Sequence, residues 1–382
     1  MARPEGREDL EAPLRGARRY ADFLRQELRD AVALPARGVC SARPLLDCAE
    51  DEPRLWARSG AMALTGDSVP RLSVGAPASC AEGALDAVCA LAGRPPTLAG
   101  LSGAALLGER AAALGLRRRG SASPGGSCRL LLASDGTLAL NLARPEDVAL
   151  LPAWLECEGI RPDDDPWIPV REIVRRRPTA ALEQRGRLMG LPVAAVPERT
   201  PSVPWLRVTP FGDVLRSPER PPQVVDLSSL WAGPLCTHLL QRCGAEVWKV
   251  ESSKRPDGAH RGERSFYDLL NAHKRSVVLD LETEGGRRQL AVLLAGADIV
   301  VESSRPRALR QLGIRAESLL GERPGRVWLS LTGHGREAPR GDWVAFGDDA
   351  AASAGLLARP EGTPAGGSDS RSGSPPCFCG DA

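Results

Sequence analysis

Lysine is rare in this chain, and its placement points to phosphate chemistry. Of the 50 basic residues only three are lysines, Lys249, Lys254 and Lys274, and they lie close together in the sequence. A lysine offers a compact charge with rotatable donors, which suits phosphate oxygens. The alternative is an ordinary solvated surface. The cluster predicts a phosphate-bearing ligand beside residues 249–274.

Candidate proton-transfer groups follow further along the chain. His334 lies in the Gly-rich stretch LTGHG, and Asp348 and Asp349 are adjacent. The aspartates are better explained as a loop or helix-capping pair, and a histidine in a Gly-rich loop is at least as often structural. Cys377 and Cys379 lack the spacing and the partner ligands of a zinc site. The sequence therefore predicts no metal site.

Alternating strands and helices must position these groups. Short β-branched runs, separated mostly by helical patterns, occupy residues 224–227, 245–251, 276–281, 297–303 and 326–333. Such alternation predicts a parallel sheet covered on both faces, and such sheets bind ligands beyond the carboxyl ends of their strands. The first crossover, residues 224–251, has no G-x-G-x-x-G, which disfavours a nicotinamide dehydrogenase.

The first half of the chain has a different pattern. Asp135-Gly136 between two apolar runs predicts a β-hairpin over 130–143. We expect helices over residues 7–33, 54–64, 82–91, 101–114, 145–157, 167–177 and 180–191. Seven prolines between Pro197 and Pro222 indicate a linker.

Composition narrows the class of protein. The 382 residues carry a formal net charge of +2, with 42% hydrophobic and 26% charged residues, which indicates neither disorder nor a nucleic-acid polycation. No apolar run approaches the length of a membrane span. The start of the chain lacks an apolar signal region, so we interpret the ten cysteines as reduced thiols and expect a cytoplasmic protein.

Together, these segments resemble the class III coenzyme A transferases, the CaiB/BaiF family. The resemblance covers residues 224–382 and is carried by DLSSLWAGP, NAHKRSVVLDL, ADIVVESSRPRALRQLG, RVWLSLTGHG and CGDA, in this order. It implies an α/β fold with a Rossmann-like CoA-binding sheet. It also implies an acyl-CoA donor, a carboxylic acid acceptor and a homodimer, without metal or nicotinamide.

The resemblance implies a set of CoA contacts. The loop after the first strand, here Leu230, Trp231 and Ala232, lies along CoA in the family. The expected cations for the phosphates are Lys254, Arg255, Lys274, Arg275 and Arg305. Asn271, Ser303, Ser304, Thr332 and Gly333 match further family positions near the ligand. The family more often has Asn and an aromatic residue at 303–304, so the aromatic side chain that would stack on adenine is absent from these positions.

The resemblance also implies a nucleophile, Asp381, in the motif FCGDA. A carboxylate attacks the acyl-CoA thioester, forms a mixed anhydride and releases CoA. Relatives continue well beyond this aspartate, so we expect a truncated chain. The alternatives are a catalytically inactive CoA-binding protein and, third, an acyl-CoA racemase. Racemases of this family place a histidine where this chain has Phe346, which transfers no proton.

The first half resembles the smaller domain of the same family. Around LWARSGAMALTG and GAPASCAEGALDAVCALAG it also resembles a second, degenerate copy of the nucleophile region, with Ser79 at the aspartate position. We expect an α+β, non-catalytic domain over 1–196, a Pro-rich linker over 197–222, a Rossmann-like CoA-binding domain over 223–358, a flexible Gly/Ser/Pro-rich loop over 359–376, and the catalytic motif at 377–382.

Overall fold

The structure is a computed structural model of the whole chain, and it describes residues 22, 24, 26, 38–39, 52–158, 160, 165–198, 206–211, 220–358 and 377–378. Most of the helix expected over 7–33 lies outside the described residues, as do the 359–376 loop and Asp381. In the expected linker, a short strand β5 (Arg207–Val208) pairs with β1 (Gly38–Val39).

The second half forms the predicted parallel sheet. Its strands are β6 (Gln223–Leu227), β7 (Glu246–Ser252), β8 (Arg275–Leu279), β9 (Ile299–Glu302) and β10 (Val327–Ser330). They run in the order β10-β9-β6-β7-β8, all parallel. The β-branched residues of the central strands, including Val224, Val225, Val300 and Val301, are buried, because both faces are covered. The mixed α/β prediction is confirmed for this half.

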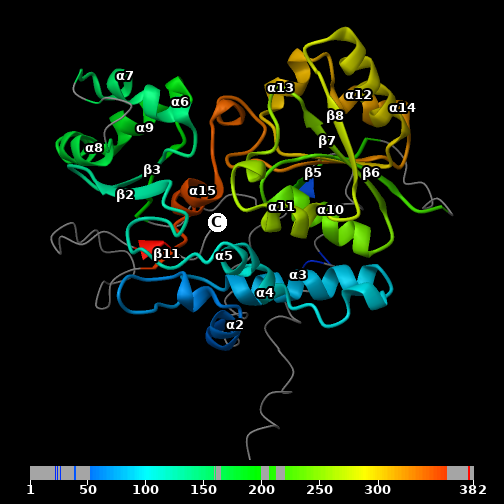
Figure 1. Cartoon of the computed structure of the whole chain (residues 1–382), viewed down its shortest axis with the longest axis horizontal. Helices are drawn as coiled ribbons and strands as arrows, with labels where there is room; N and C mark the ends of the chain where they lie inside the picture. Colours follow the sequence, from blue (N-terminus) through cyan, green and yellow to red (C-terminus); the bar gives the residue numbers. More distant parts are fainter. Residues whose placement is uncertain are drawn as a thin grey trace, which may run out of the picture.

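Helices cover both faces of this sheet (Figure 1). One group consists of α10 (Ala232–Arg242) and α11 (Arg264–Asn271), and the other of α12 (Glu284–Gly296), α13 (Pro306–Gln311) and α14 (Ala316–Glu322). The sheet and these helices are called the Rossmann-like unit below. Its strand order reverses between β6 and β9, and the crevice beyond such a reversal is where open α/β sheets bind ligands.

The α+β unit of the first half contains the predicted hairpin. Strands β2 (Cys128–Leu132) and β3 (Thr137–Asn141) pair antiparallel, and β4 (Val193–Ala195) extends the sheet. The turn residue Asp135 accepts a hydrogen bond from the backbone N–H of Thr179 at 2.7 Å. Its helices are α6 (Pro145–Ala149), α7 (Leu151–Leu155), α8 (Trp167–Val174) and α9 (Thr179–Met189), which pack around Trp154.

A layer of helices, called the lower layer below, lies under the Rossmann-like unit in Figure 1. It comprises α2 (Glu52–Arg58), the 3-10 turns η3 (Ala61–Ala63) and η4 (Pro96–Leu98), α3 (Pro77–Leu91), α4 (Gly103–Leu106) and α5 (Glu109–Ala113). The single helix expected over 54–64 is wrong, because Gly60 takes a left-handed conformation (φ 82°) that separates α2 from η3.

The last described segments join the two halves. Helix α15 (Gly347–Ser353) packs on β3 and β4, and β11 (Leu357–Ala358) pairs with β12 (Cys377–Phe378). Phe378 is buried against Leu130 and Ala139 of the hairpin. The segment just before the expected nucleophile is therefore fixed on the α+β unit.

A buried carboxylate caps the longest helix of the lower layer. Glu52 accepts hydrogen bonds from the backbone N–H groups of Ala78 (3.0 Å) and Ser79 (2.8 Å) and from the Ser73 hydroxyl (3.1 Å). Ser79 is itself fully buried, and its Oγ has no hydrogen-bond partner among the described residues. The serine at the expected aspartate position of the degenerate copy thus lies beside a structural carboxylate.

We predict that Glu52→Ala lowers the free energy of unfolding by about 2 kcal/mol, since it leaves buried N–H groups at a helix start unpaired. Urea unfolding followed by circular dichroism measures the change. Glu52→Gln keeps an acceptor and is expected to lose less. Equal stability of the wild type and Glu52→Ala would show that the cap contributes nothing.

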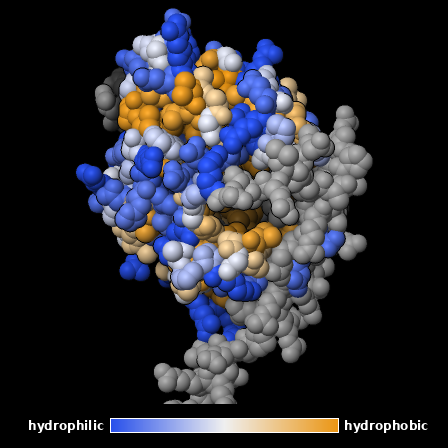
Figure 2. Space-filling view, turned by 90° about the vertical axis from the view of Figure 1, so that its right-hand side faces the viewer, coloured by the Kyte–Doolittle hydropathy of each residue, from blue (hydrophilic) through white to orange (hydrophobic). Residues whose placement is uncertain are grey.

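Both edge strands keep apolar side chains in solvent. Val278 on β8 and Val327 on β10 are 62% and 52% exposed. Figure 2 views the molecule from the right-hand side of Figure 1 and shows an apolar patch on the Rossmann-like unit. Among the described residues, no helix is long and apolar enough to cross a bilayer. Exposed apolar edges fit a partner subunit, and the homodimer stays a prediction.

Candidate functional site

The loops after β6 and β9 meet where the strand order reverses. The backbone N–H of Ser229 donates to Ser303 Oγ at 3.0 Å. Ser304, next along, donates its hydroxyl to Glu302 at 2.8 Å. The structure thus brings together two of the segments that the sequence predicted to line one ligand, residues 230–232 and 303–304.

The loop Ser228–Trp231, called the switch-point loop below, has a constrained backbone. Leu230 adopts φ 69°, a left-handed conformation that a branched side chain rarely takes. Its N–H donates to Asp257 Oδ1 at 2.9 Å. A Cβ on Gly233 would lie 2.1 Å from Ser228 Oγ, so only glycine allows the loop to fold back on the first turn of α10.

Two buried ion pairs lie beneath this loop. Lys249 Nζ pairs with Asp257 Oδ2 at 2.9 Å and donates to the Ser228 carbonyl. Lys274 Nζ pairs with Asp226 Oδ2 at 3.1 Å. Burial alone would raise the pKa of Asp226, but Lys249 and Lys274, with two hydroxyl donors, hold it below its ordinary value. Burial lowers the pKa of Lys274 to about 8, so the Asp226–Lys274 pair is ionised at neutral pH.

Lys274, predicted as a phosphate ligand, has internal partners instead. Besides Asp226, its ammonium lies within 3.0 Å of the Pro234 carbonyl, Thr237 Oγ1 and Asn271 Oδ1, and its side chain is 1% exposed. Asn271, another predicted contact, serves here as its acceptor. A direct role of either residue in CoA binding stays a prediction.

The remaining predicted cations differ in exposure. Lys254 and Arg255 are exposed on the loop after β7, and Arg275 stacks on Trp248 and pairs with Glu246 at 3.6 Å. Burial, and then the nearby guanidinium groups of Arg307, Arg144 and Arg255, lower the pKa of Arg305. Arg144 belongs to the α+β unit and was missed by sequence reasoning, because nothing local links it to residue 305.

The other predicted contacts surround the same edge of the sheet. Trp231 is half-buried in a cluster with Phe266 and Leu114, while Ala232 is exposed at the start of α10. Thr332 Oγ1 accepts the N–H of Gly335 at 2.9 Å. Gly333 packs so closely that a Cβ would lie 2.3 Å from the Cβ of Ala345. Asp381 lies outside the described residues.

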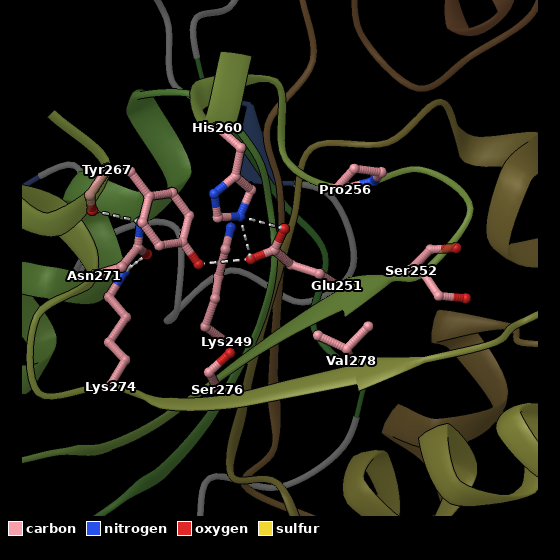
Figure 3. Close-up of a pocket in the computed structure, with 11 residues that line it drawn as sticks. Lys249, Glu251, Ser252, Pro256, His260, Tyr267, Asn271, Lys274, Ser276 and Val278 are labelled. Carbon is pink, nitrogen blue, oxygen red and sulfur yellow. Dashed lines mark hydrogen bonds and ion pairs between the residues drawn. The ribbon is translucent and has the colours of Figure 1, made fainter. Parts of the chain in front are cut away.

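A cavity of about 410 Å³ opens beside β7 and β8 (Figure 3). At its wall Glu251 accepts hydrogen bonds from the Tyr267 hydroxyl (2.6 Å) and the Asp257 N–H (2.7 Å), and its carboxylate lies 3.1 Å from His260 Nε2. Burial and Glu251 raise the pKa of Tyr267. Sequence reasoning missed this group; the acidic end of the strand AEVWKVE was the available signal.

The predicted proton-transfer residues lie between the two units. Burial, then Arg187 and Arg340, lower the pKa of His334 to about 4, so this histidine is neutral at pH 7. Asp349 caps α15 by accepting the Phe346 N–H at 2.9 Å, and it accepts Asn141 Nδ2 at 3.3 Å. Asp349 Oδ2 and Asn141 Oδ1 have no hydrogen-bond partner among the described residues.

Asp349 gives a pH prediction. Burial raises its pKa to about 7, so between about pH 4 and 7 the unfolded chain loses a proton that the folded chain keeps. The free energy of unfolding should then fall with rising pH over this window, by about 4 kcal/mol. Asp349→Asn mimics the protonated acid, so its advantage in unfolding free energy over the wild type should be larger at pH 8 than at pH 4. A stability difference that does not change with pH would contradict this.

Comparison with known proteins shows which protein family the second half of the chain is similar to. Residues 222–380 match the sequence profile of CoA-transferase family III. The segment is similar to a succinyl-CoA–D-citramalate CoA-transferase of Chloroflexus aurantiacus, with 34% identity over 155 residues, which is 37% of this chain and 39% of that protein. An acetyl-CoA:oxalate CoA-transferase of Acetobacter aceti is 30% identical over 150 residues, covering 37% and 39% of the two chains.

Residues 222–380 belong to CoA-transferase family III. This transferase segment spans between a third and two-fifths of the length of the curated relatives. Among solved structures, a CaiB/BaiF family protein from Brucella suis shares 31% identity at a TM-score of 0.31, covering 34% of this chain and 37% of the other. The resemblance read from the motifs is confirmed at the level of the family.

Proposed function

We propose that this chain is an acyl-CoA:carboxylate CoA-transferase. The observation that carries the proposal is the family match, which runs from β6 to Gly380 and so includes both the strand-order reversal and the residue before Asp381. CoA lies across the switch-point loop, with its phosphates near Lys254, Arg255 and Arg305. Exposed or half-buried guanidinium and ammonium groups suit phosphate oxygens.

The reaction exchanges a thioester for an anhydride and back. An Asp381 oxygen attacks the acyl-CoA carbonyl, the C–S bond breaks, and CoA leaves as the thiolate. The thiolate attacks the Asp381 carbonyl, which forms the aspartyl-CoA thioester and releases the donor acid. The acceptor carboxylate attacks that thioester and expels CoA thiolate, which leaves a second mixed anhydride between Asp381 and the acceptor. The thiolate then attacks the acceptor's carbonyl and expels Asp381 as the free carboxylate. Each step conserves atoms and needs no redox partner.

The first test traps the intermediate. Purified protein is mixed with an acyl-CoA and hydroxylamine, and the peptide containing Asp381 is analysed by mass spectrometry. Activated carboxyl groups react with hydroxylamine, so we expect a hydroxamate at Asp381 that requires acyl-CoA. CoA binding without any trapped product would instead identify a catalytically inactive CoA-binding protein.

A further inference from the structure

The buried lysines have a distribution that phosphate binding does not explain. The side chains of Lys249 and Lys274 are each 1% exposed, yet these are two of the only three lysines in a chain with 50 basic residues. In the described part of the chain, most other ion pairs use arginine, as in Arg144–Asp147 and Arg323–Asp298. These two positions therefore need a property that arginine lacks.

The geometry supplies that property. Lys274 Nζ lies among four oxygens that come from β6, α10 and α11: Asp226 Oδ2, the Pro234 carbonyl, Thr237 Oγ1 and Asn271 Oδ1. Lys249 Nζ lies between Asp257 Oδ2 and the Ser228 carbonyl. A small tetrahedral ammonium can reach acceptors in several directions, whereas a planar guanidinium has five donors to satisfy and a larger volume.

These contacts converge on one short loop. Ser228 has its carbonyl bonded to Lys249 and its N–H bonded to Asp226 at 3.0 Å. Leu230 N–H is bonded to Asp257, the partner of Lys249. Lys274 holds the Pro234 carbonyl, which lies in the first turn of the helix that follows. The strained Leu230 conformation persists because the surrounding contacts fix it.

We propose that Lys249 and Lys274 are positioning residues that hold the switch-point loop in one conformation before any ligand binds. The proposal rests on the proposed function in one respect only, namely that this loop then receives CoA. A loop fixed in advance loses less entropy when it binds, so the two ion pairs would contribute to CoA affinity without touching CoA.

The test begins without any ligand. Amide hydrogen exchange is measured on the full chain for the wild type, Lys249→Met and Lys249→Met with Asp257→Asn. The double variant removes both charges but keeps an amide oxygen for the Leu230 N–H, so it remains informative if the single variant fails to fold. We expect exchange at Ser229 and Leu230 to rise about 10-fold in both, and the amides of β9 to stay protected.

Glu52→Ala is the matched control, since it removes a buried charge from the lower layer and not from beneath the switch-point loop. It should leave exchange at Ser229 and Leu230 unchanged. Wild-type exchange rates at these two amides in a folded lysine variant would overturn the proposal. So would an equal rise across the whole chain in all three variants, because that pattern reports global loosening.

A second readout separates positioning from general stability. Under conditions where the variants stay folded, the Kd for CoA should rise about 10-fold in Lys249→Met, and the KM for the acceptor acid should not change. An unchanged Kd would overturn the claim that the pairs assist binding. If the wild type binds no CoA, the proposed function fails, and the exchange experiment still decides whether the lysines fix the loop.

Discussion

Replacing Asp381 by asparagine is expected to lower the rate of CoA transfer by at least about 10³-fold, because the amide cannot attack a thioester. CoA binding should persist, since the nucleophile is not among the groups assigned to the phosphates. Steady-state transfer between an acyl-CoA and a carboxylic acid, monitored by liquid chromatography, gives the rate. Calorimetry gives the Kd for CoA.

Asp348→Asn is the control for this variant, because it removes a buried carboxylate that takes no part in the proposed reaction. It is expected to retain most of the transfer activity. Comparable losses in Asp348→Asn and Asp381→Asn would mean that Asp381 is not the nucleophile.

The largest expected effect on stability comes from Asp226. Its carboxylate is fully buried and pairs with Lys274, and it also accepts hydrogen bonds from Ser228 and from Thr237 at 2.5 Å. Asp226→Ala would leave a buried ammonium without its counter-ion, so we expect a loss of about 3–5 kcal/mol in the free energy of unfolding. Urea unfolding measures it.

The double variant Asp226→Ala, Lys274→Met removes both charges and should recover part of that loss. Glu284→Ala, which breaks the exposed pair with Arg288, should leave the midpoint nearly unchanged. Strictly additive single and double variants would contradict the assigned pairing.

Local signals in the sequence were sufficient for much of the fold. The Asp135-Gly136 hairpin forms where the turn chemistry predicts it. All five parallel strands begin and end close to the β-branched runs that predicted them. The order of those strands was not predicted, because sequence periodicity identifies a strand but does not show which strands lie next to it.

The site was harder to predict, because its contacts join distant residues. Asp226 and Lys274 are 48 positions apart, and Asn141 and Asp349 are 208 apart. The clustering of the lysines is visible in the sequence, but charge alone does not distinguish a phosphate ligand from a buried ion pair. Burial decides between them, and burial depends on tertiary packing that a single sequence does not display.

The central claim is that the carboxyl edge of the β6–β10 sheet binds coenzyme A. Isothermal titration of the purified chain with CoA tests it most directly, with Arg255→Ala and Arg305→Ala as weakened variants. We predict saturable heat with a wild-type Kd below about 1 mM, and a weaker Kd in both variants. Absence of binding heat in the wild type, or identical affinity in all three proteins, would contradict the assignment.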